Sequence, residues 1–531
     1  MPAHRKNILF ITTDQHRVDH LGCYGNPVIA TPHIDALAAR GRRFTRNYVA
    51  SPICMPNRAT MMTGRMPSVH GLHCNGVPLA LRSNTFGDLL RASGYRTGLV
   101  GKSHLQNMTG LPPATVAPQA NPALTPPPAA LSETEKAMWS DGNYNEESLK
   151  RWQSDPQPIF GPYYGFDEIE LCTMHGDMVH GDYDGWLKQR LPNADAARGP
   201  ANALPDDRYT VPQAYRTSVP EEFYPTRYIQ ERTVARLESL AQSDSPFFLH
   251  CSFPDPHHPF TPPGHYWDMY DPANVPLSPI SGHPADHPII TRLRELRKAG
   301  KAKTLGTVPF VVDVEETRQA IALTYGMITM IDDAVGAIVT TLERLGLADT
   351  TTIIFTSDHG DFMGDHGLML KSSLHYDGLV RVPFIWHDPD EKNGGAAIDA
   401  LTSTIDLAPS FLDTSGLAPF HGMQGRSLRP LLHDPKADWR KAVLIEEDGH
   451  EAFPCFDGPL RTRSIVTQRH RMSIYDKLPL VELYDLSTDP LEQTNLADTP
   501  EGARIRAGLF EEMSRTMMEM CDWSPFPTGR A

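Results

Sequence analysis

Cysteine is scarce in this chain: there are 7 in 531 residues, an odd number without the regular spacing of a disulfide framework. This usage argues against a disulfide-stapled secreted scaffold and fits a reducing compartment. Long apolar runs are missing as well, since no stretch reaches the roughly 20 consecutive apolar residues that a membrane span needs. The first apolar run is interrupted by Asp14, so it is too short for a signal peptide. We therefore expect a cytoplasmic protein that no membrane holds.

A surplus of positive charge is also missing, because 49 Lys and Arg stand against 64 Asp and Glu, a formal charge of −15. Most of the surface would repel a polyanion, which excludes a general role on nucleic acid or acidic membranes. A small anionic substrate in a locally positive pocket is still compatible with this charge.

The motifs of several other enzyme classes are absent. There is no Gly-x-Ser-x-Gly elbow, no Gly-x-Gly-x-x-Gly after a predicted strand and no zinc-type cysteine cluster. Gly101-Lys102-Ser103 is not a phosphate-binding P-loop, because that motif needs glycine where this chain has Arg96.

What is present is an alternation of strand and helix patterns. Hydrophobic content of 40% and charged content of 21% are those of a globular protein, and the length suggests a large domain plus a smaller one. The alternation predicts an α/β fold, a large, mostly parallel sheet flanked by helices. We predict strands at residues 8–13, 97–100, 246–252, 352–356 and 382–386, and helices over 34–41 and 315–345.

The pattern changes along the chain in three places. Residues 111–130 are rich in proline and alanine and residues 193–220 are polar with scattered prolines, so both are predicted insertions within a large domain of residues 1–420. Residues 421–531 read as short strands near 442–446 and 463–467, then a tail, which predicts a smaller C-terminal subdomain.

The last segment carries an apolar pattern. Methionines and a phenylalanine recur at near-helical spacing over residues 510–520, and Trp523 and Phe526 follow. This surface could pack on its own domain or on a neighbouring subunit of a homo-oligomer, and the sequence leaves both open.

Polar residues follow directly after several predicted strands. Asp14, Lys102, His257 and Asp358 each lie at or just beyond a strand end. In open parallel sheets, ligands bind beyond the carboxyl ends of the strands. We therefore expect these distant residues to converge on one rim.

Cys54-Met55-Pro56-Asn57-Arg58 is the most distinctive motif. Proline two residues after Cys54 suits the first turn of a helix, and Gly64 can end that helix. Cys54 would then lie at a helix N-terminus, which favours an anion, with Arg58 one turn later on the same face. The alternative is a reduced cysteine that caps a helix, with Arg58 as a surface charge.

The chain contains four further motifs besides this pentapeptide: Gly101-Lys102-Ser103-His104, Pro256-His257-His258-Pro259, Asp358-His359 and Lys371. In these motifs the chain resembles the sulfatase family, the formylglycine-dependent branch of the alkaline phosphatase superfamily. Residues 483–490, continuing to 495–497, resemble the C-terminal antiparallel-sheet subdomain of sulfatases. The resemblance implies an alkaline phosphatase-like fold with a catalytic domain over residues 1–420, and only the two insertions are unmatched.

The resemblance also implies the reaction. A formylglycine-generating enzyme would oxidise Cys54 to formylglycine, whose hydrate attacks the sulfur of a sulfate monoester and forms a covalent sulfate at residue 54. Arg58 and Lys102 would stabilise the transferred group, and His104 would take the proton when sulfate is released. His257 would protonate the leaving oxygen. His258, the next residue, is the alternative for this role.

Two further residues are assigned by the same resemblance. Lys371 matches the lysine that contacts the oxygen between sulfur and the leaving group. The alternative without a functional role is a solvated lysine on a loop. Asn75 is a weaker candidate for holding a substrate oxygen, as in phosphonate monoester hydrolases.

Carboxylates and an imidazole after two strands also suit one divalent cation. The ligands implied by the resemblance are Asp14, Gln15, the residue-54 oxygen, Asp358 and His359. Gln15 and His359 stand where many sulfatases have Asp and Asn, and imidazole moves the preference from Ca²⁺ toward Mn²⁺. A turn after a buried strand is the alternative for Asp358-His359. The Asp-Gln and Asp-His pairs look like those of choline sulfatases and phosphonate monoester hydrolases.

Three functions follow. The first is hydrolysis of aryl or small alkyl sulfates, with some promiscuity. The second is hydrolysis of phosphonate monoesters or phosphodiesters at the same site. The third is anion binding without catalysis, by a protein whose Cys54 is never oxidised.

Overall fold

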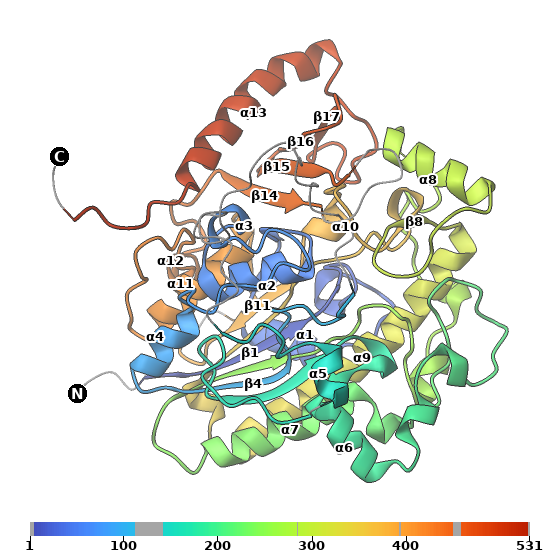
Figure 1. The fold of residues 1–531 in the computed structure, drawn as a ribbon. Helices are drawn as coiled ribbons and strands as arrows, with labels where there is room; N and C mark the ends of the chain where they lie inside the picture. The colour runs from blue at the N-terminus through green and yellow to red at the C-terminus, as the bar shows by residue number, and fades with distance from the viewer. Residues whose placement is uncertain are drawn as a thin grey trace, which may run out of the picture.

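The computed structural model describes residues 5–111, 142–154, 156–283, 285–391, 394–449 and 458–528. Within them, a large domain is built on a nine-stranded sheet and a smaller one on a four-stranded antiparallel sheet (Figure 1). The expected α/β class, with helices around a large sheet and a small antiparallel subdomain, is confirmed. The predicted insertion at 111–130 lies outside the described residues except for residue 111. The insertion at 193–220 forms loops with short 3-10 turns at Ala194–Ala197 and Pro200–Asn202.

The large sheet is mostly parallel. Strand β1 pairs in parallel with both β7 and β9, and β4 pairs in parallel with β5 and β7. β11 runs antiparallel to β9 and β2, and β6 runs antiparallel to β5. The order across the sheet is β12 (Ala397–Ile398), β2 (Arg42–Phe44), β11 (Phe384–His387), β9 (Thr351–Ser357), β1 (Asn7–Thr13), β7 (Phe247–Ser252), β4 (Arg96–Lys102), β5 (Glu168–Thr173) and β6 (His180–Gly181).

Both faces of this sheet are buried, which explains why β1 reads as one apolar run. Leu9 and Ile11 point into one core and Ile8 and Phe10 into the other, since side chains alternate along a strand. The first core is completed by α1 (Pro32–Arg40), α6 (Asp182–Arg190), α7 (Pro225–Leu240) and α9 (Val314–Arg344). The second is completed by α2 (Cys54–Thr63), α4 (Phe86–Ala92), α11 (Leu407–Thr414) and α12 (Arg429–His433).

The remaining short elements surround the sheet. They are α3 (Pro67–His70), α5 (Leu149–Ser154), α8 (Pro288–Lys298), α10 (Asp377–Val380) and two strand pairs, β3 (Asn47–Tyr48) with β13 (Thr402–Ser403) and β8 (Phe310–Val311) with β10 (Leu368–Met369).

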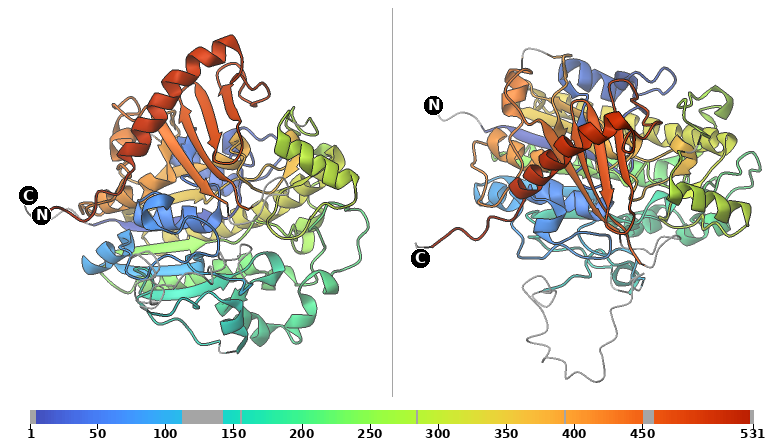
Figure 2. Two further views of the ribbon diagram at one scale, coloured as in Figure 1. Left: turned by 45° about the horizontal axis from the view of Figure 1, so that its top comes forward. Right: turned by 90° about the horizontal axis from the view of Figure 1, so that it is seen from above.

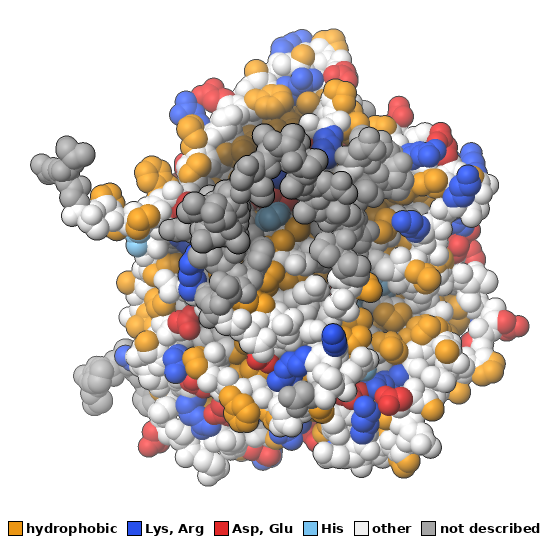
Figure 3. Space-filling view, viewed as in Figure 1, with side chains coloured by type: hydrophobic (Ala, Val, Ile, Leu, Met, Phe, Trp, Pro, Cys, Tyr) orange, Lys and Arg blue, Asp and Glu red, His pale blue; other side chains and the backbone are white. Residues whose placement is uncertain are grey.

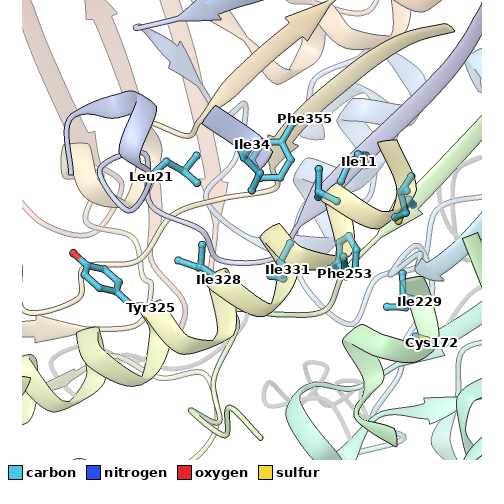
Figure 4. Close-up of a cluster of buried hydrophobic side chains, with 14 of the residues drawn as sticks. Ile11, Leu21, Ile34, Cys172, Ile229, Phe253, Tyr325, Ile328, Ile331 and Phe355 are labelled. Carbon is cyan, nitrogen blue, oxygen red and sulfur yellow. The ribbon is translucent and has the colours of Figure 1, made fainter. Parts of the chain in front are cut away.

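Helix α9 is the central helix of one layer. Asp313 and Glu316 form a capping box at its start, which satisfies the free N–H groups there. Figure 4 shows Ile328 and Ile331 of α9 in the same apolar cluster as Ile11 of β1. By length and composition alone α9 could cross a membrane, but 89% of its most apolar window is buried inside the protein.

The smaller sheet is a meander with α13 (Pro500–Glu519) laid across it (Figure 2). Leu509 and Met513 of α13 are buried against this sheet, whereas Met518, Trp523 and Phe526 are exposed. The helix thus packs on its own domain, and a subunit contact through the exposed residues stays a prediction. The strands are β14 (Ala442–Asp448), β15 (Arg461–Thr467), β16 (His470–Tyr475) and β17 (Val481–Asp485).

Candidate active site

The carboxyl ends of the parallel strands gather the candidate residues at one edge. Asp14 follows β1, Lys102 is the last residue of β4 and Asp358 follows β9. Main-chain hydrogen bonds fix these strand ends, since Asp14 N–H donates to the Asp255 carbonyl and Asp358 N–H to the Thr13 carbonyl. The three side chains are fully buried. The convergence predicted from strand ends is therefore what the structure shows.

Cys54 is the first residue of α2, as the motif predicted. Ile53 before it is extended, and Gly64 ends the helix with a left-handed φ of 64°. Asn57, in the first turn, accepts hydrogen bonds from the Ala50 N–H and the Thr404 hydroxyl. These contacts hold the start of α2 in one position, with Cys54 only 1% exposed.

Basic groups surround the thiol of Cys54. Its Sγ lies 2.9 Å from Nζ of Lys371 and 3.0 Å from Nε2 of His359. Oδ1 of Asp14 lies 3.8 Å away. Burial and Asp14 raise the pKa of the thiol, but Lys371 and His359 outweigh them and the pKa is lowered. A nucleophile at this position therefore meets two groups that stabilise negative charge.

Lys371 lies two residues after β10 and is 2% exposed, so it is not a solvated loop lysine. Its ammonium also donates to Oε1 of Gln15 at 3.2 Å and lies 3.0 Å from Nε2 of His257. Burial lowers the pKa of Lys371, but Cys54 and Asp14 outweigh it and the pKa is raised. Lys371 therefore stays protonated in the pocket.

Arg58 spans the strand ends from the helix side. Its Nε donates to Oδ2 of Asp358 at 2.7 Å and its Nη2 to Oδ2 of Asp14 at 3.4 Å. Its Nη1 donates to the carbonyl of Lys102 at 3.0 Å. Arg58 is 3% exposed, so it is not a surface charge, and it fixes one oxygen of each carboxylate.

The two neighbouring histidines face different partners. Nδ1 of His257 meets the His258 carbonyl at 2.5 Å, so this nitrogen carries the hydrogen and Nε2 points at Lys371. Nδ1 of His258 lies 3.1 Å from Nε2 of Gln15, whose amide also donates to Asp361. Of the two histidines, His257 faces the basic pocket, whereas His258 contacts the side chain of Gln15. This arrangement favours His257 over His258 as the group that protonates the leaving oxygen.

Four donor groups could hold a metal ion. Ligand atoms of Asp14, Cys54, Asp358 and His359 all lie within 4.8 Å of one another. Arg58 binds Oδ2 of both carboxylates, so a cation would bind at their Oδ1 atoms, of which that of Asp358 also accepts the Gln15 N–H at 3.1 Å. Nδ1 of His359 is bound to the Gly360 carbonyl at 2.8 Å, so Nε2 is the ring nitrogen that would bind a cation, once it has lost its proton. Two hard oxygens and one fixed imidazole suit a divalent cation.

Lys102 and His104 lie beside this cluster. Nζ of Lys102 donates to Asp14. His104 is 7% exposed, and burial, followed by Lys102, lowers its pKa well below the usual value. His104 is therefore a neutral base. Its Nδ1 has no hydrogen-bond partner among the residues that the structure describes.

His175 belongs to the same pocket, although the sequence motifs did not identify it. Its Nε2 lies 2.6 Å from Nζ of Lys102, and its ring stacks on that of His257 at 3.6 Å. Burial and Lys102 lower its pKa to about 3, so it accepts a hydrogen bond from the ammonium. His175 lies two residues after β5, so the strand-end argument would have found it had that strand been predicted.

Asn75 has a supporting position. Its Oδ1 accepts the backbone N–H of Met55 at 3.2 Å, next to Cys54. The side-chain NH₂ of Asn75 takes no part in that bond, so it could donate to a substrate oxygen.

Charge is distributed differently inside and outside. On the face seen in Figure 3, basic and acidic side chains are interspersed. Inside the pocket, Arg58, Lys102 and Lys371 lie close to one nucleophile position. The fold and the site together define an α/β protein with a buried, positively charged pocket around one cysteine at a helix N-terminus.

Comparisons with known proteins identify the family. The sulfatase family model matches residues 6–417, and the model for the C-terminal part of N-sulphoglucosamine sulphohydrolase matches residues 364–519. The chain belongs to the sulfatase family, enzymes that hydrolyse sulfate esters and generally use a metal ion and formylglycine.

Individual relatives cover nearly the whole chain. An arylsulfatase of Clostridium perfringens is 28% identical over 503 residues, 94% of this chain and 91% of that protein. The multifunctional alkaline phosphatase superfamily protein PehA of Trinickia caryophylli is 28% identical over 526 residues, 94% of this chain and 93% of that protein. The phosphonate monoester hydrolase of Agrobacterium radiobacter superposes with a TM-score of 0.75 at 26% identity, covering 98% of this chain and 96% of that chain.

Proposed function

We propose that this protein hydrolyses aryl or small alkyl sulfate monoesters through a covalent sulfate on formylglycine at residue 54. The observation that supports this most is the position of Cys54, whose Sγ is within 3.0 Å of both Lys371 and His359 and 3.8 Å from Asp14. A helix N-terminus, a candidate cation site and basic side chains thus meet at one atom. Maturation would need a formylglycine-generating enzyme in the same compartment, for which we propose the cytoplasm.

The proposed cofactor is one divalent ion, Ca²⁺ or Mn²⁺. Its ligands would be Asp14, Gln15, the oxygen on residue 54, Asp358 and His359. When bound, the ion would add positive charge that polarises the transferred group.

In the first half of the reaction, one hydroxyl of the hydrate gives its proton to the pair formed by Lys371 and His257 as its oxygen bonds to sulfur, and the bond from sulfur to the leaving oxygen breaks. That oxygen needs a proton. Burial, then His175 and His258, lowers the pKa of His257 well below its usual value, whereas the pKa of Lys371 is raised. In the thiol form Cys54 is the largest of the causes that raise the pKa of Lys371, and Asp14 and Asp358, which act in the same direction, remain after oxidation of residue 54. We place the resting proton on Lys371, 3.0 Å from His257, so that the pair can deliver it.

In the second half, the remaining hydroxyl loses its proton to His104 while its oxygen forms the C=O bond and the bond from carbon to the sulfate oxygen breaks. Sulfate leaves and water restores the hydrate. A neutral His104 is suited to this step, because it can accept the proton. Arg58, Lys102 and Lys371 stabilise the anionic group throughout.

A second candidate is hydrolysis of phosphonate monoesters or phosphodiesters at the same site. Gln15, His359 and Asn75 favour it, together with the similarity to the phosphonate monoester hydrolase of Agrobacterium radiobacter. Both reactions need the same buried nucleophile and positive pocket, and they differ in the charge of the transferred group.

One comparison separates the two. The chain would be produced together with a formylglycine-generating enzyme, and kcat/KM measured for an aryl sulfate and an aryl phosphonate monoester with the same phenol. We expect the sulfate to have the higher kcat/KM. The opposite order would assign the second function, and no turnover of either would leave anion binding alone.

A further inference from the structure

A buried carboxylate lies beneath the main-chain turn that carries His104. Glu147 is 0% exposed. Its Oε2 accepts the N–H of His104 at 2.8 Å, and its Oε1 accepts the N–H groups of Leu105 at 2.8 Å and Gln106 at 3.1 Å. The hydroxyl of Tyr163 donates to the same Oε1 at 2.6 Å. Three successive N–H groups therefore point at one side chain.

These contacts need an ionised carboxylate. All four partners are donors, and a carboxylate accepts at both oxygens without donating. Burial raises the pKa of Glu147, while Tyr163 and the three N–H groups lower it and offset part of that effect. A glutamine at this position would place its NH₂ group, a donor, against a main-chain N–H, also a donor. The four hydrogen bonds therefore depend on a carboxylate.

The turn above Glu147 has a conformation that needs support. His104 has a φ of 59°, in the left-handed region that is unfavourable for residues other than glycine. Such a residue persists only where its surroundings hold it. Glu147 supplies that hold, because it binds the N–H of His104 itself and those of the next two residues.

The segment that carries Glu147 is tied to the same turn from both sides. The side chain of Gln106 accepts the N–H of Glu146 at 2.8 Å and donates to the Asn143 carbonyl at 3.1 Å. The N–H of Leu149 donates to the Met108 carbonyl at 2.8 Å. Glu147 is thus held in register with the turn over residues 104–108.

We propose that Glu147 is a positioning residue that fixes the imidazole of His104 for the release of sulfate from residue 54. This inference rests on the proposed function and adds a residue that acts on one half of it. Glu147 touches no reacting atom and works through the backbone of His104.

The effect is confined to the second half of the reaction. The groups that serve the leaving alcohol, His257 and Lys371, lie on loops after β7 and β10 and make no contact with Glu147. Lys102 is held independently, by its pairing with Cys172 in the sheet and by Asp14. Loss of Glu147 should therefore slow the step of His104 and leave the departure of the alcohol nearly unchanged.

The test is Glu147→Gln in the formylglycine-containing protein, assayed on a series of aryl sulfates with phenols of different pKa. We expect kcat to fall about 10- to 100-fold, by analogy with the loss seen when a residue that holds a metal ligand in place is replaced. Each substrate should give a fast burst of phenol followed by the same slow rate. Mass spectrometry of the quenched enzyme should show the sulfuryl group on the peptide with residue 54.

Glu146→Gln is the matched control. Glu146 is adjacent in sequence, and its side chain contacts Asn143 and Arg151. Only its main-chain N–H bonds to the turn, at Gln106, and the substitution leaves that bond in place. It should keep wild-type kinetics. A readout that needs no activity is amide exchange of residues 104–106 in the unmodified thiol form, which should quicken in Glu147→Gln only.

Several outcomes overturn the inference. Glu147 is merely structural if kcat and kcat/KM fall together, the dependence on the phenol persists and no sulfated peptide appears. Unchanged kinetics remove any role. If Glu147→Gln does not fold, Tyr163→Phe and Glu147→Asp carry the same criteria, with a smaller burst expected. Failure of the proposed function itself is distinguishable, because the wild-type enzyme would then not turn over any aryl sulfate.

Discussion

The ammonium of Lys371 lies 2.9 Å from Sγ of Cys54 and 3.0 Å from Nε2 of His257. One side chain thus links the nucleophile position to the histidine proposed to serve the leaving group. In the thiol form Cys54 and Asp14 raise the pKa of Lys371 against the effect of burial, and Asp14 still does so once residue 54 is oxidised, which supports the proposal that Lys371 carries the proton for the leaving oxygen.

Replacement of Lys371 by alanine should lower kcat/KM about 10²- to 10⁴-fold for esters of weakly acidic alcohols. The loss should shrink for nitrophenyl esters, because a good leaving group needs little proton transfer. The measurement is the slope of log kcat/KM against leaving-group pKa, which should steepen. Lys436→Ala, at an exposed position, is the control. An equal loss across the series would reduce Lys371 to ground-state binding.

The two adjacent histidines should separate in their effects. His257→Ala should slow weakly activated esters most, since its Nε2 faces Lys371. His258→Ala should instead loosen Gln15, whose amide lies 3.1 Å from Nδ1 of His258, and weaken metal binding about tenfold or more. Kinetics on two leaving groups and metal titrations of both variants check this. The assignment is reversed if His258→Ala shows the leaving-group effect.

Metal content should depend on His359. We expect about one divalent ion per wild-type chain by elemental analysis and much less in His359→Ala, because its Nε2 and two carboxylates share one point. Exposed His433 provides the control substitution. Chelation should lower both activity and melting temperature, because an ion bound only by the folded state stabilises it. A full metal complement in His359→Ala would contradict this ligand set.

Acid stability should depend on His20. This ring is 4% exposed, packs edge-on against Tyr325 at 5.0 Å and has its pKa lowered to about 3 by burial. The unfolded chain takes up a proton near pH 6.5, so the folded state loses stability as pH falls from there toward 3. Between about pH 7 and pH 5, protonation of His20 in the unfolded chain lowers the free energy of unfolding by about 2 kcal/mol.

His20→Phe tests that linkage, because phenylalanine keeps a ring and cannot titrate. The free energy of unfolding of the variant, measured in urea, should fall less than that of the wild type between the two pH values. The difference between the proteins should therefore grow on acidification. Parallel pH curves would show that His20 is not the responsible group.

Much of this arrangement could be predicted from sequence, since it depends on local rules. A buried parallel strand reads as an apolar run, and the residue after it must lie at the ligand-binding edge, which located Asp14 and Asp358. The start of α2 could be read from Pro56 and its end from Gly64, so Cys54 was placed at the helix N-terminus.

The rest depends on contacts between distant segments. Strand β5 was not predicted, so His175 behind it was not seen. Glu147 lies outside every motif, and its role appears only when the folded chain brings it beneath His104. The antiparallel direction of β11 follows from its pairing with β9 and β2, which periodicity alone does not specify.

The central claim is that an oxidised residue 54 performs the chemistry. Preparations with different fractions of the aldehyde at this position, quantified by mass spectrometry, should hydrolyse an aryl sulfate at rates that rise in proportion to that fraction and extrapolate to zero for the pure thiol. Equal rates for the thiol and aldehyde forms would contradict the account.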